Sequence, residues 1–105
     1  MKVVYPNLNI MKKEEKYSEA IQFLESILHQ GNHFFEQQDY HTALQYYQKG
    51  LDSFLQSQHI PELWPAYQKI WMNKALAHQS LRQYEKMREA AWIANTLLEK
   101  IENME

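Results

Sequence analysis

The sequence predicts an all-α fold, and three observations lead to that prediction. Two glycines and three prolines among 105 residues are too few for a sandwich or barrel built on many turns. Eleven glutamines, together with many Leu, Ala, Glu and Lys residues, favour helix. Apolar residues recur every three or four positions through most of the chain. We therefore expect one helical domain over residues 11–105, with a hydrophobic content of 45% to supply its core.

The chain is expected to start with an arm and a long first helix. Residues 1–10 read as an extended or disordered arm, because Val3, Val4 and Tyr5 favour extended backbone and Pro6 interrupts them. The first helix is expected from about residue 11 to residue 37. Its apolar positions are Ala20, Ile21, Leu24, Ile27, Leu28, Gly31, Phe34 and Phe35.

A second helix is expected to fold back on the first. Asp39 is a suitable N-cap, and the helix should run to about Gln56. Residues 38–40 leave almost no room for a loop, so the two helices should lie antiparallel and side by side. Gly31 and Gly50 are placed where a bulky side chain would hold the two backbones apart.

The second half of the chain predicts another pair of helices. After a loop over residues 57–61, the third helix should begin near Pro61 to Pro65, because proline is tolerated in a first turn. On this helix His78 is expected to be a buried imidazole that a neighbour satisfies. The fourth helix should run from Tyr84 to about Glu102, and its expected buried seam is Tyr84, Met87, Ala91, Ala94, Leu98 and Ile101.

The small and aromatic residues of the first helix pair follow a known repeat pattern. They are Gly31, Phe34, Tyr40, Ala43, Tyr47 and Gly50, and in this order they resemble one tetratricopeptide repeat. Trp71, Ala75, Tyr84, Ala91 and Ala94 resemble a second copy, in which His78 and Met87 depart from the pattern. The copies cover about residues 24–57 and 62–102. Gly31 and Ala75 are 44 residues apart, against a usual period of about 34, and the lengthened first repeat is loosely similar to immunophilin-type tetratricopeptide domains.

The resemblance implies a non-catalytic protein–protein interaction module. In the family, the first helix of each repeat lines an inner groove, and the residues that match here are Leu28, Asn32, Phe35, Lys69, Met72, Asn73 and Leu76. Such a surface suits an apolar or amphipathic peptide, or a partner helix. Relatives that bind the acidic tail of heat-shock chaperones carry a Lys where this chain has Leu28, so the cations for a carboxylate are mostly missing. Leu28 could equally be core, and the two asparagines could be structural amides.

The fourth helix carries a second apolar stripe, and this predicts that something covers it. A terminal repeat is usually polar on its outer face, and two repeats are fewer than the three or so needed for stability. The alternative function is therefore a self-assembling scaffold that forms a homodimer through the fourth helix. The residues expected at that contact are Ala90, Trp92, Ile93 and Leu97.

Other functional classes find little support in the composition. The net charge of −2 comes from intermixed acids and bases, so nucleic-acid binding is not expected. No apolar run is long enough for a membrane span. The absence of cysteine fits a cytoplasmic chain. We find no phosphate-binding loop or nucleophile motif, and expect neither an enzyme nor a cofactor. A remote alternative is a metal-dependent enzyme that uses His29, His33 and Glu36, which share a helix face, although a solvated surface is the better interpretation.

Overall fold

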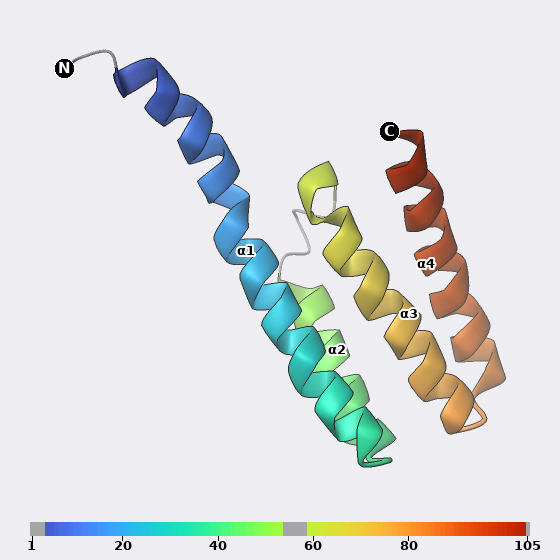
Figure 1. Ribbon diagram of the computed structural model, residues 1–105. Coiled ribbons are helices and arrows are strands. Elements are labelled where there is room, and N and C mark those ends of the chain that lie inside the picture. The colour runs from blue at the N-terminus through green and yellow to red at the C-terminus, as the bar shows by residue number, and fades with distance from the viewer. Residues whose placement is uncertain (1–3, 54–58, 105) are drawn as a thin grey trace.

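The computed structural model describes residues 4–53 and 59–104, with side chains from residue 17 onward. The prediction of an all-α fold is confirmed. The described residues fold into four α-helices, and a short 3₁₀ turn, η2, leads into the third (Figure 1). Their bounds are α1 (Val4–Glu36), α2 (Tyr40–Ser53), η2 (Pro61–Leu63), α3 (Trp64–Ser80) and α4 (Tyr84–Asn103).

The ends of the first two helices differ from the prediction or lie outside the described residues. α1 begins at Val4, so the expected extended arm is wrong for residues 4–10. Pro6 lies in the first turn of α1, where backbone amides have no partner within the helix, so its missing N–H costs little. Residues 1–3 are outside the described residues, as is the expected end of the second helix near Gln56.

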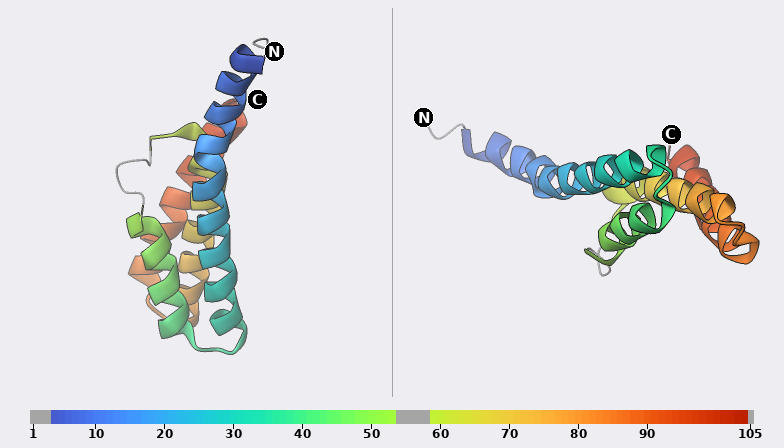
Figure 2. Two further views of the ribbon diagram at one scale, coloured as in Figure 1. Left: turned by 90° about the vertical axis from the view of Figure 1, so that its left-hand side faces the viewer. Right: turned by 90° about the horizontal axis from the view of Figure 1, so that it is seen from below.

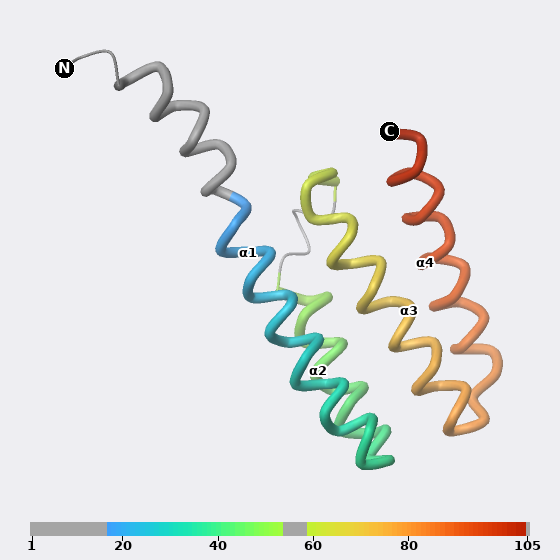
Figure 3. Tube along the Cα trace, in the orientation of Figure 1, coloured from blue at the N-terminus to red at the C-terminus, as the bar shows by residue number. Residues whose placement is uncertain are grey.

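The helices form two antiparallel hairpins that pack on each other. α1 pairs with α2, α3 pairs with α4, and α3 also contacts both α1 and α2. α3 therefore lies between α2 and α4 (Figures 1 and 2), and the Cα trace in Figure 3 follows the same course. The core is built where three helices meet. Its largest fully buried side chains are Leu24, Tyr47, Leu51, Leu63, Tyr67 and Ile70.

The two hairpins close through the same turn. Gln38 N donates to Phe35 O (2.9 Å) and Asp39 N donates to Phe34 O (2.9 Å). Forty-four residues further on, Arg82 N donates to Gln79 O (2.9 Å) and Gln83 N donates to His78 O (2.8 Å). Both turns are Schellman motifs, which end a helix with one residue in the left-handed region. The chain therefore repeats one helical hairpin with a spacing of 44 residues.

Close helix contact explains the two glycines. A Cβ atom on Gly31 would lie 2.5 Å from Tyr47 Cε1, which is closer than side chains can approach. A Cβ on Gly50 would lie 3.0 Å from Ile27 Cγ2 and 3.2 Å from Ile70 Cδ1, so Gly50 faces α1 and α3 at once. The prediction that small residues stand where the backbones approach is confirmed at both positions.

The face with which α4 packs matches the predicted seam only in part. Ala94 is buried as expected, and Ala90 is buried beside it, whereas Tyr84 and Leu98, which were expected in the seam, are exposed. Small side chains one turn apart let α4 approach α3 closely, and larger side chains at these positions would hold the helices apart. In the part of the chain that the structure describes, no helix combines the length and apolar character needed to cross a bilayer.

Candidate binding surfaces

One amide oxygen joins three helices at the surface where α1 and α3 meet. Tyr47 Oη, from α2, donates a hydrogen bond to Asn32 Oδ1 over 2.5 Å. Asn73 Nδ2, from α3, donates to the same oxygen over 3.1 Å. Burial raises the pKa of Tyr47 to about 12, so its hydroxyl stays protonated and remains a donor at physiological pH. The structure thus brings together the two asparagines that sequence reasoning assigned to the groove, and it gives Asn32 a structural role.

The other residues assigned to the groove surround this pair to different depths. We call the seven residues Leu28, Asn32, Phe35, Lys69, Met72, Asn73 and Leu76 the α1–α3 face. Leu76 is 42% exposed, and Met72 is half-buried. Leu28 and Phe35 are half-buried and pack against the core. Phe35 also meets Tyr40 edge-on, with ring centroids 5.1 Å apart, and both Phe34 and Phe35 pack against the core.

Of the residues expected to pair two copies through α4, Trp92, Ile93 and Leu97 line one cleft, whereas Ala90 is buried. Ala90 is only 2% exposed, so it is unavailable to a second copy, and its assignment to a self-association surface is wrong. Ile93 and Leu97 are half-buried, and Leu97 packs against the core. Trp92 alone of the four stands out, with 70% of its side chain exposed.

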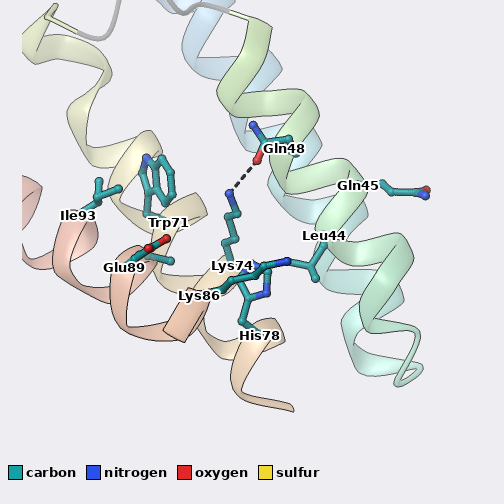
Figure 4. A pocket seen from close by; sticks show the side chains of 10 residues that line it. Leu44, Gln45, Gln48, Trp71, Lys74, His78, Lys86, Glu89 and Ile93 are labelled. Atoms are coloured by element: carbon teal, nitrogen blue, oxygen red, sulfur yellow. Dashed lines mark hydrogen bonds between the residues drawn. The ribbon is translucent and has the colours of Figure 1, made fainter. Parts of the chain in front are cut away.

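Sequence reasoning missed a groove that runs along α3 between α2 and α4. Two clefts, of about 520 and 240 Å³, adjoin each other and share Trp71 and Ile93 as lining residues. We call the two clefts together the outer groove. Its floor on α3 is a stripe at spacings of three and four residues, consisting of Tyr67, Trp71, Lys74 and His78. Figure 4 shows its wider part, with Trp71 and Ile93 close together at one side and Lys74 reaching toward α2.

The apolar stripe on α4 was a signal for this groove, but in the sequence it indicated a contact with a second copy. Ala90, Ile93 and Leu97 on α4, which were expected at a contact with a second copy, form one wall of the outer groove. The opposite wall comes from α2 and includes Leu44 and Gln48. Helical periodicity identifies an apolar stripe, but it does not say which neighbouring helix the stripe faces.

Lys74, in the wider cleft of the outer groove, makes its contacts with neutral groups. Lys74 Nζ donates to Gln48 Oε1 over 2.7 Å and lies 4.6 Å from the centroid of the Trp71 ring. Gln48 Nε2 in turn donates to Asp52 Oδ1 over 2.8 Å, so an amide stands between the lysine and the carboxylate. Burial lowers the pKa of Lys74, Asp52 and Glu89 oppose this shift, and Lys86 adds to it.

His78 lies at one end of the groove floor, and a residue of the turn between α3 and α4 fixes its ring. It is buried, and a hydrogen bond of 2.8 Å joins His78 Nδ1 to Gln83 Oε1. Burial lowers the pKa of His78, and the positive charges of Lys74 and Lys86 lower it further, against the opposing effect of the Gln83 bond. The prediction that a neighbour satisfies this buried imidazole is confirmed.

The residues of the remote metal hypothesis do not form a metal site. Among the described residues, no group of three or more His, Cys, Asp or Glu side chains is placed to hold a metal ion. Nε2 of His33 lies 3.1 Å from Nε2 of Gln37, one turn further along the chain.

Comparison with known proteins adds no relative. Neither protein-family models, nor curated proteins, nor solved structures give a match to this chain.

Proposed function

We propose that this chain is a non-catalytic protein–protein interaction module with tetratricopeptide-like hairpins, and that its α1–α3 face holds a peptide or helix of a partner. The observation that carries this proposal is the exposure of Leu76 beside Asn73, in the middle of a helix whose other apolar residues are largely buried. An exposed leucine alone is ordinary. Here it adjoins half-buried Met72 and an ordered amide pair.

The amide pair can contribute to recognition as well as to stability. Asn32 Oδ1 already accepts two hydrogen bonds, which leaves Asn32 Nδ2 and Asn73 Oδ1 without a partner among the described residues. Among the described residues, every buried side-chain nitrogen or oxygen has a hydrogen-bond partner. Because these two atoms have none, they are not buried and can reach solvent. One amide donor and one amide acceptor match the C=O and N–H groups of a peptide backbone.

Selection of peptides from a displayed random library tests this proposal. Peptides enriched on the wild-type chain should lose at least tenfold in affinity for Leu76→Glu, because the substitution puts a charge into the apolar contact. His41→Glu, at an exposed position of α2, is the matched control and should leave affinity unchanged. Circular dichroism checks that both variants keep their helicity. Enriched peptides that bind Leu76→Glu as well as the wild type would place recognition elsewhere and contradict the proposal.

Self-association through α4 is a second candidate, and the exposure of Trp92 favours it. A large exposed aromatic side chain fits a protein contact, because tryptophan is enriched at protein interfaces. Light scattering over a concentration series measures the mass, which is 12.7 kDa for one chain and twice that for a dimer. Trp92→Glu should convert a dimer into a folded monomer. A wild-type chain that stays monomeric at the highest concentration, or a Trp92→Glu dimer, would exclude this candidate.

A further inference from the structure

The outer groove lies on the side of α3 opposite to the α1–α3 face. Successive residues of an α-helix are about 100° apart, so positions 69, 73 and 76 face away from positions 67, 71, 74 and 78. Lys69 and Leu76 belong to the α1–α3 face, and Trp71 and Lys74 to the outer groove. A ligand in one surface therefore leaves the other accessible.

Two lysines of the outer groove lie over tryptophan rings. Lys74 lies over Trp71, and at the far end Lys100 Nζ, from α4, lies 5.4 Å from the centroid of the Trp64 ring. Lys86 lines the wide end near His78. Glu89 is the one carboxylate among the described residues that line either cleft. The groove thus has an apolar centre and lysines toward both ends.

The lysines of this groove favour an anionic ligand. The contacts of Lys74, with Gln48 and the Trp71 ring, are to uncharged groups, so its ammonium has no charged acceptor at bonding distance there. The present bond to the Gln48 amide has one charged partner, whereas a bond to a carboxylate adds the attraction between two opposite charges. A carboxylate that replaced Gln48 as the acceptor would therefore strengthen this contact, and its negative charge would oppose the repulsion between Lys74 and Lys86.

The length of the groove favours a peptide over a compact anion. Lys86 and Lys100 are fourteen residues apart on α4, which corresponds to about 21 Å along the helix. An extended peptide of about six residues covers the same distance. A single phosphate or a small dicarboxylic acid would reach the lysines at one end and leave the aromatic centre unused.

We propose that the outer groove binds a peptide segment of a partner protein that has an apolar centre and carboxylates on both sides of it. The apolar residues would pack on Trp71 and Ile93. The carboxylates would pair with Lys74 and Lys86 at one end and with Lys100 at the other.

Two synthetic peptides test the proposal on the full chain. EELFEE, acetylated and amidated at its ends, carries the proposed pattern, and QQLFQQ keeps its shape without its charge. Calorimetric titration in about 50 mM salt should show at least tenfold tighter binding of EELFEE, and the difference should shrink at high salt because screening weakens ion pairs. Equal affinities for the two peptides, or no binding of EELFEE, would overturn the proposal.

Matched lysine variants show where the peptide binds. Lys74→Gln and Lys100→Gln should each reduce affinity for EELFEE at least fivefold. Lys69→Gln, the same change on the opposite side of α3, should have no effect, and equal losses in all three variants would contradict the proposed site.

Inorganic phosphate is the competing probe. If it binds with the same dependence on Lys74 while EELFEE does not, the groove takes small anions and the proposal is wrong. Leu76→Glu should leave EELFEE binding intact. The test of the outer groove is therefore independent of the test of the α1–α3 face.

Discussion

Gln38 and Arg82 occupy the same position in two turns that lie 44 residues apart, and both have a positive φ, of 64° and 61°. Each is the residue that follows the cap of a helix and turns the chain toward the next one. Side chains disfavour this backbone region because Cβ crowds the neighbouring carbonyl oxygen, and glycine usually takes such positions. The chain therefore holds two identical sites of backbone strain.

Replacement of either residue by glycine is expected to stabilise the fold. The left-handed conformation costs roughly 1–2 kcal/mol for an ordinary residue, and the greater freedom of glycine in the unfolded chain offsets part of the gain. Gln38→Gly and Arg82→Gly should each raise the free energy of unfolding by up to about 1 kcal/mol, measured by urea denaturation. Gln37→Gly, one residue earlier and without a positive φ, should not stabilise. Destabilisation by Gln38→Gly would contradict the assigned turn.

Gly31→Ala is expected to destabilise the chain although alanine favours helix. The added methyl group would collide with the Tyr47 ring, which the hydroxyl bond to Asn32 holds in place. Overpacking of this kind costs about 1–3 kcal/mol, more than the roughly 1 kcal/mol that alanine gains over glycine in a helix. In a Tyr47→Leu background the cost should be smaller, because no ring stands in the way. An equal cost in both backgrounds would show that the contact is not the cause.

Tyr47→Phe should cost about 1 kcal/mol of unfolding free energy, because it removes one of the two donors to Asn32 Oδ1 and keeps the ring. Asn32→Ala should cost more, since it leaves the buried Tyr47 hydroxyl without its acceptor. Chemical denaturation measures both variants. If the two cost the same, the bond from Tyr47 to Asn32 does not contribute as the structure indicates.

Stability should fall when the pH drops below about 6.5, and His78 should cause part of that fall. The pKa of His78 is lowered in the folded chain, so just below the usual value the unfolded chain binds a proton that the folded chain does not. The contribution of His78 to the free energy of unfolding is therefore complete above pH 6.5, and it is lost as the pH decreases from there. His78→Gln should show a smaller loss between pH 7.5 and pH 5 in urea denaturation. His41→Gln, at an exposed position, controls for the removal of one histidine.

The helices and their close contacts followed from local patterns. Stripes at spacings of three and four residues predicted all four helices, and the short segment around Asp39 predicted the antiparallel pairing of α1 and α2. Gly31 and Gly50 were recognisable because only a residue without a side chain fits where two backbones meet. These features depend on neighbours in sequence or on one pair of helices, and so a single sequence carries them.

The face with which α4 packs did not follow from its pattern. α4 has apolar residues on two stripes, so periodicity left its rotation open, and the buried face turned out to be that of Ala90 and Ala94. The outer groove and the double use of the Asn32 oxygen needed the relative positions of three helices. Spacing within one helix does not contain that information, and the long-range placement of Lys74 beside Gln48 shows the same limit.

The shared acceptor on Asn32 also has a consequence for the order in which the chain assembles. Its bond to Tyr47 spans 15 residues within the first hairpin, and its bond to Asn73 spans 41 and requires α3 to dock. The shorter loop closes at a lower entropic cost, so the Tyr47 bond belongs to an early step and the Asn73 bond to a late one. Tyr47→Phe should therefore mainly slow folding, whereas Asn73→Ala should mainly accelerate unfolding. Stopped-flow kinetics would thus resolve the two bonds of one oxygen atom as two successive events.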